Sequence, residues 1–133
     1  MNNLVVSGKR KTAIAKATIS EGNGNVTYNK KPISLLPKLQ QLEIVEPLII
    51  ANEVLGGLKF NIALNVRGGG TNSQIEASRL AISRALVEVT KSEELRLALL
   101  SYDRNLLVAD TRRKEACKPG DSKARAKRQT SYR

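Results

Sequence analysis

The sequence predicts an α+β fold, because segments with strand periodicity and segments with helix periodicity follow one another without a repeating strand–helix–strand unit. Residues 59–67, KFNIALNVR, alternate apolar and polar side chains and form the clearest strand. Residues 73–90 carry apolar side chains at helical spacing. The last 22 of the 133 residues have an excess of basic over acidic side chains and contain too little apolar surface to fold on themselves. We therefore expect a globular domain, residues 1–111, and an extended basic tail, residues 112–133.

The N-terminal part is expected to begin with strands. Residues 12–20, TAIAKATIS, mix β-branched residues with short alternation, and residues 26–28, VTY, resume a strand. Between them, residues 21–25 supply the glycine and asparagine that favour positive φ. These two strands are predicted to pair as a β-hairpin. Residues 4–6 are expected to extend the first strand upstream of a basic loop at residues 8–12.

A helix is expected after Pro37, because five aliphatic residues there recur at helical spacing. Pro47 either kinks this helix or opens a second one. Gly56 and Gly57 are expected to end it. The five aliphatic residues at helical spacing are Leu39, Leu42, Val45, Ile49 and Ile50.

A longer helix follows the next strand. Ser73 and Glu76 have the spacing of a capping box, and the helix is expected to reach about Thr90, roughly 27 Å further on. Its expected buried stripe is Ile75, Ile82, Leu86 and Val89.

Three smaller expectations concern what surrounds this helix. Thr90 and Glu93 suggest a cap for another helix. Arg79 is expected to be solvated or paired with Glu76 at i,i+3. Residues 106–108 are apolar enough to dock a short segment against the domain.

Charge is segregated along the chain, which has 23 Lys and Arg, 12 Asp and Glu, and a net charge of +11. Residues 112–133 hold nine basic and two acidic residues, and residues 1–31 hold six and one. Residues 32–111 hold eight and nine, so the middle is nearly neutral. Solubility alone does not require such segregation, and the pattern favours a polyanionic partner.

Two segments of the domain are candidate phosphate-binding sites. Lys9, Arg10 and Lys11 place three cations in the basic loop, although a solvated loop is the alternative. Arg67 and Gly68-Gly69-Gly70 lie between a strand and a helix, where backbone amides can approach phosphate. The alternative for the glycines is a tight turn that needs positive φ.

The sequence does not favour catalysis. The chain has no His, one Cys and no carboxylate pair at a defined spacing, so we expect no enzymatic activity, metal site or cofactor. Gly70-Thr71-Asn72 also lacks the lysine of a P-loop. No apolar run is long enough for a membrane span or a signal peptide, so an intracellular, cytoplasmic protein is expected.

Four motifs give the chain a resemblance to a known family. They are GKRKTAIAKATI at 8–19, VRGGGTNSQIEASRLAISRAL at 66–86, LLVADTRRKE at 106–115 and ARAKRQTSYR at 124–133. With these motifs the chain resembles the universal small-subunit ribosomal protein S-nine family. The third motif and the terminal Ser-Tyr-Arg resemble the archaeal and eukaryotic branch.

The resemblance implies the ribosomal S5 second-domain-like fold, in which helices pack on one face of a sheet with a left-handed crossover. It also implies a structural role in the head of the small subunit, with rRNA, P-site tRNA and neighbouring ribosomal proteins as partners. The tRNA contact would be made by Ser131, Tyr132 and Arg133. The residues expected to bind rRNA are Lys9, Arg10, Lys11, Arg67, Gly68, Gly69, Gly70, Arg112, Arg113, Lys114, Lys118, Lys123, Arg125, Lys127 and Arg128.

Two other function classes remain open on the residues alone. One is a small NTP-binding enzyme that uses residues 68–71 over phosphate, and the other is a nucleic-acid chaperone for which the tail alone would suffice.

Overall fold

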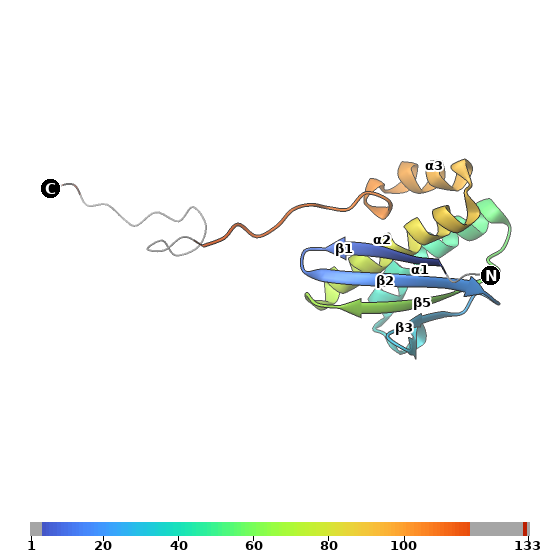
Figure 1. The fold of residues 1–133 in the computed structure, drawn as a ribbon, viewed down its shortest axis with the longest axis horizontal. Coiled ribbons are helices and arrows are strands. Elements are labelled where there is room, and N and C mark those ends of the chain that lie inside the picture. The colour runs from blue at the N-terminus through green and yellow to red at the C-terminus, as the bar shows by residue number, and fades with distance from the viewer. Residues whose placement is uncertain (1–3, 118–131, 133) are drawn as a thin grey trace.

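The computed structural model describes residues 4–117 and Tyr132. In this part of the chain, a five-stranded mixed sheet with the order β1-β2-β5-β3-β4 carries helices on one face (Figure 1). The strands are β1 Leu4–Arg10, β2 Ala13–Glu21, β3 Val26–Tyr28, β4 Lys31–Pro32 and β5 Phe60–Arg67. The helices are α1 Lys38–Leu55, α2 Thr71–Thr90 and α3 Glu93–Tyr102, with short 3₁₀ helices η1 Ile33–Leu35 and η2 Arg104–Leu106. The predicted α+β class is confirmed.

Small side chains bring α2 close to the sheet. Every second residue of β2, from Ala13 to Ile19, is buried, as are the alanines that α2 turns toward the sheet. Gly8 belongs to this contact, since a Cβ there would lie 2.3 Å from the carbonyl oxygen of Ala77. The short residues in these strands thus allow the main helix to cover the sheet at close range.

Several elements match the sequence-based predictions. Ile62, Leu64 and Val66 of β5 are buried, as the alternation predicts. Helix α2 ends at Thr90, and Gly56 ends α1 in a left-handed conformation with φ +68°. The docking of the segment 106–108 is confirmed by Leu106, which is fully buried against α2 and α3.

The predicted hairpin between residues 12–20 and 26–28 is wrong. Strand β5 lies between β2 and β3, antiparallel to the first and parallel to the second. The loop after β2 is held instead by Asn61 of β5, whose side-chain oxygen accepts from the amides of Asn23 and Asn25 at 3.0 and 3.1 Å. This contact spans more than 35 residues, so local periodicity could not reveal it.

Strand β2 forms a hairpin with β1 instead, while β3 forms one with β4, and the first of these corrects the prediction of a basic loop at residues 8–12. Lys9 pairs with Ile14 and Arg10 with Ala13, so Gly8, Lys9 and Arg10 belong to a strand. The turn itself consists of Lys11 and Thr12, with Lys11 at φ +52°.

The helix predicted after Pro37 is confirmed as α1, a single helix with Pro47 inside it, but its five aliphatic residues at helical spacing do not all face the core. Ile44, Pro47, Leu48 and Ala51 are buried. Of the five, Ile50 is partly buried against the core, whereas Leu39, Leu42 and Ile49 are more than half exposed. The helix carries apolar residues on two sides, and packing against α2 uses only one of them. Spacing alone could not identify that side.

The two predicted helix caps are also wrong. Helix α2 begins at Thr71 after Gly70, which places Ser73 within the first turn, where it does not cap the helix. Ser92 caps α3 by accepting from the amide of Leu95 at 3.3 Å, while the Thr90 hydroxyl donates to the carbonyl of Leu86. Glu76 is paired with Arg10 rather than with Arg79.

Candidate nucleic-acid interface

The β1–β2 turn and the glycine loop after β5 lie against each other at one end of the sheet. A Cβ on Gly68 would lie 2.6 Å from the carbonyl oxygen of Thr12, and one on Gly69 would lie 2.9 Å from the Cβ of Ala13. Both glycines also have left-handed backbones, with φ +76° and +68°. The tight-turn interpretation therefore explains these two residues without any ligand.

Gly70 differs from its two neighbours. Its φ is −99°, and a Cβ at this position would have no atom within 4 Å. It is the N-cap of α2, no side chain caps the helix there, and it lies at the positive end of the helix dipole. Neither backbone conformation nor packing within the described chain requires glycine here.

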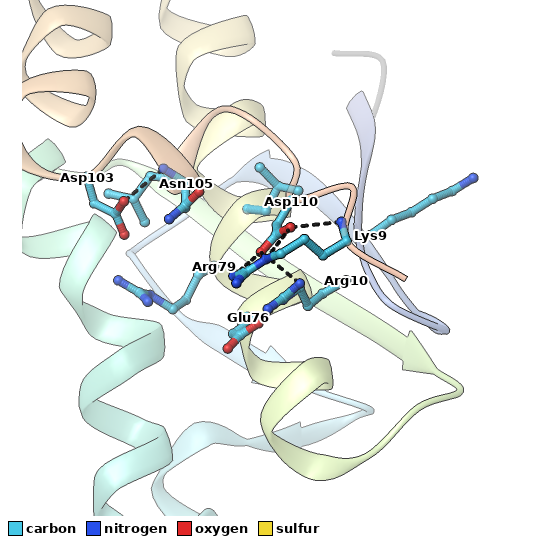
Figure 2. A pocket seen from close by; sticks show the side chains of 10 residues that line it. Lys9, Arg10, Glu76, Arg79, Asp103, Asn105 and Asp110 are labelled. Carbon is cyan, nitrogen blue, oxygen red and sulfur yellow. Dashed lines mark hydrogen bonds and ion pairs between the residues drawn. The ribbon is translucent and has the colours of Figure 1, made fainter. Parts of the chain in front are cut away.

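The C-terminal segment starts beside this end of the domain. Asp110 accepts from the backbone amide of Arg112 at 2.9 Å and from its guanidinium Nη2 at 2.6 Å. The Nη1 atom of Arg10 lies 2.9 Å from the same carboxylate, and its Nε pairs with Glu76. Figure 2 shows Arg10 reaching from the end of β1 to both acids. The pKa of Asp110 lies well below its usual range. The hydrogen bonds from Arg112 are the main cause, and the positive charge of Arg10 adds to the effect.

A groove with a basic lining forms between the hairpin turn and the start of the tail. Its wall on the domain is Arg10, Lys11 and Thr12, and its other wall is residues 112–114. Arg112, Arg113 and Lys114 are all exposed, as is Lys11. The charge of Arg10 is balanced by Glu76 and Asp110, so this residue positions the tail as well as contributing to the groove.

The uncovered face of the sheet continues the positive surface. Lys9 is aligned with Ile14 and Arg67 across three strands, and all three side chains are exposed. Lys9 points away from the carboxylates around Arg10 in Figure 2. Lys16 occupies the next outward position of β2, and it was missed by the sequence analysis. The alternation of buried alanines on either side of Lys16 is the pattern that could have indicated it.

Other cations have structural partners. Arg79 is paired with Glu46 of α1, not with Glu76 as predicted. Arg84 donates to the carbonyl oxygens of Leu107 at 2.9 Å and Ser7 at 3.3 Å, and so ties the segment after η2 to β1. These two arginines serve the packing of the domain.

The distal tail residues fall largely outside the described residues. Tyr132 is 93% exposed. The predicted positions outside the described part are Lys118, Lys123, Arg125, Lys127, Arg128, Ser131 and Arg133.

Within residues 4–117, no group of three or more His, Cys, Asp or Glu side chains is arranged to hold a metal ion. None of the described helices combines the length and apolar character needed to cross a membrane.

Comparison with known proteins agrees with the resemblance noted in the motifs. The sequence profile of the family described as ribosomal protein S9/S16 matches residues 8–133. The chain is 49% identical over 129 residues to the small ribosomal subunit protein uS9 of Methanococcus vannielii, and 50% identical to that of Methanococcus maripaludis strain C7. Each alignment covers 95% of both chains. Given these matches, the chain belongs to the ribosomal protein S9/S16 family and is of the archaeal type.

Proposed function

We propose that this protein is a non-enzymatic component of the small subunit of the cytoplasmic ribosome and that it binds rRNA in the subunit head. Its relatives are named as small-subunit proteins, and its mixed sheet with helices on one face fits the S5-like fold expected for the family. The left-handed crossover, between β3 and β5 through α1, is part of this proposal.

The main support for the proposal is that three features able to bind an anion lie at the same end of the domain. The hairpin turn, the N-terminus of α2 and the start of the tail lie together, and Lys11 faces Arg113 and Lys114 across one groove. Such a surface can follow the phosphates of folded RNA without reading bases. Gly70 supports it, because an open position at a helix N-terminus lets a phosphate approach the backbone amides.

The tail is proposed as a separate functional unit. Asp110 fixes its first arginine, and the segment after η2 then leaves the domain on the side of the β1–β2 turn (Figure 1). At about 3.3 Å per residue, a fully extended chain of residues 112–133 would span about 70 Å. We assign its cations to rRNA and Ser131, Tyr132 and Arg133 to the anticodon stem-loop of the P-site tRNA, as the family resemblance implies.

Charge reversal tests the rRNA part of the proposal. Lys11→Glu with Arg113→Glu places two carboxylates in the basic groove, while Lys59→Glu with Lys91→Glu makes the same charge change at the opposite end of the domain. Only the first pair is expected to weaken binding to small-subunit rRNA strongly. For this pair, the slope of the logarithm of the binding constant against the logarithm of the salt concentration should decrease in magnitude by about 1.8, at about 0.9 for each lost phosphate contact. Equal losses in the two variants would show that net charge, and not this groove, binds the RNA.

A further inference from the structure

A second surface of the domain has the opposite character from the basic groove. Helices α1 and α3 form an open groove on the helical layer, lined by aliphatic side chains, three glutamates and one tyrosine. Leu42 is 54%, Ile49 52% and Tyr102 58% exposed. No Lys or Arg is among the residues that line it: Leu42, Glu43, Glu46, Ile49, Ile50, Glu53 and Tyr102.

One wall of this groove is held in place by a hydrogen-bond network. The Tyr102 hydroxyl donates to Glu46, and Glu46 is also paired with Arg79 of α2. This hydrogen bond, followed by the negative charge of Glu46, raises the pKa of Tyr102. Both partners of Glu46 thus lie within the domain. Glu43 and Glu53, in contrast, make no ion pair with any described residue. The two carboxylates flank the aliphatic centre of the groove.

The composition of the surface excludes several occupants. RNA would bring phosphates against Glu43 and Glu53, which repel them. A second copy docked face to face would place these same carboxylates against each other. The chain's own tail could balance the charge, but residues 112–133 contain no Leu, Ile, Val, Met or Phe to cover the aliphatic side chains.

We propose that this groove binds a basic segment of a neighbouring protein, with aliphatic side chains against Leu42 and Ile49 and Lys or Arg beside Glu43 and Glu53. The inference rests on the proposed function only for its setting, the assembled subunit. Glu43 and Glu53 are ten residues apart, or about 15 Å along the helix. An extended segment of about five residues covers that length, so the partner motif has cations about four to five residues apart with aliphatic residues between them.

Photo-cross-linking in assembled subunits tests the proposal. A benzophenone amino acid replaces Leu42 or Ile49 in the full chain, the variant is expressed in an archaeal host, and small subunits are purified and irradiated. A third variant carries the probe at Lys16 on the open face of the sheet. We expect the probes at 42 and 49 to attach to a Lys- or Arg-containing aliphatic segment of another ribosomal protein, and the probe at 16 to attach to rRNA.

Attachment of the groove probes to rRNA, to a second copy of this chain or to an acidic segment would overturn the inference, as would the absence of any cross-link in subunits that contain the variant. Absence of the protein from the subunits would overturn the proposed function and this inference together. A variant that enters the subunit but cross-links to one of these other targets would therefore overturn the docking inference alone and leave the proposed function intact.

A charge-reversal pair tests the role of the carboxylates. With the probe at Ile49, Glu43→Lys and Glu53→Lys together should lower the cross-link yield about tenfold, because like charges replace an attraction at two positions. The control pair Glu88→Lys and Glu94→Lys changes two exposed glutamates outside the groove and should leave the yield unchanged. An equal cross-link yield in the Ile49 probe variant alone, in the Glu43/Glu53 pair and in the control pair would show that Glu43 and Glu53 do not select the partner.

Discussion

At the residue scale, the three consecutive glycines after β5 have different physical requirements. Gly68 and Gly69 have left-handed backbones and lie against the Thr12-Ala13 backbone. Gly70 has an ordinary backbone conformation and open space around it. Folding explains the first two, whereas nothing in the described fold requires glycine at the third, which is the position proposed to admit a phosphate.

Alanine substitutions should separate these two requirements. Gly69→Ala should destabilise the domain by about 1–2 kcal/mol, since a left-handed conformation costs an L-residue that much even before the close contact with Ala13 is counted. Gly70→Ala should leave the free energy of unfolding in urea nearly unchanged but weaken rRNA binding. Normal rRNA affinity in Gly70→Ala would argue against a phosphate at the N-terminus of α2.

Asp110 is the second residue with a testable role, because it links Arg10 in the sheet to Arg112 in the tail. A carboxyl whose pKa is lowered by folding stabilises the native state fully above its unfolded pKa, about 3.9, and loses that contribution as the pH falls toward the native pKa. The stability difference between wild type and Asp110→Asn should therefore shrink below about pH 4. NMR titration should show the Asp110 pKa rising in Arg112→Ala; an unchanged value would mean that Arg112 is not its main partner.

At the element scale, α1 shows why helical spacing did not identify the buried side. Its aliphatic residues occupy two faces, one packed on α2 around Ile44 and one exposed around Leu42 and Ile49. A surface helix needs only one apolar face for folding. The second face is therefore available for a partner, and this is the observation on which the proposed docking groove depends.

The two faces of α1 should respond differently to truncation. Ile44→Ala should cost about 2–5 kcal/mol, since Ile44 is fully buried and a cavity would remain. Leu39→Ala should change the free energy of unfolding by less than about 0.5 kcal/mol, because Leu39 is 69% exposed. Urea denaturation of both variants measures this directly, and a large loss in Leu39→Ala would contradict the assignment of the buried face.

At the scale of the whole molecule, positive and negative surfaces are separated. The basic groove, the open sheet face and the tail suit RNA, whereas the groove between α1 and α3 suits a basic protein segment. The nearly neutral charge of residues 32–111 therefore conceals an acidic patch. A protein placed between rRNA and other proteins would use both surfaces.

Deletion of Arg133 tests the far end of the tail. The domain should keep its stability, and subunits should assemble normally, because the groove and the rest of the tail are unchanged. Retention of tRNA in the P site should weaken by about 1–3 kcal/mol, the scale of a charge-assisted hydrogen bond. Filter binding of tRNA to purified wild-type and mutant subunits measures the loss. Equal affinities would limit the role of the tail to rRNA.

The sequence by itself determined the α+β class, strand β5, the C-terminal end of α2, the charge segregation and the family. These features depend on the order of residues within a segment, and periodicity indicates burial where a segment has a single apolar face. Tertiary structure decided which strands are neighbours, which face of α1 is buried, and that Arg10 is bound by Glu76 and Asp110 while Lys11 lies beside Arg113. Those outcomes depend on contacts between residues tens of positions apart, such as Asn61 with the loop after β2, and no local pattern encodes them.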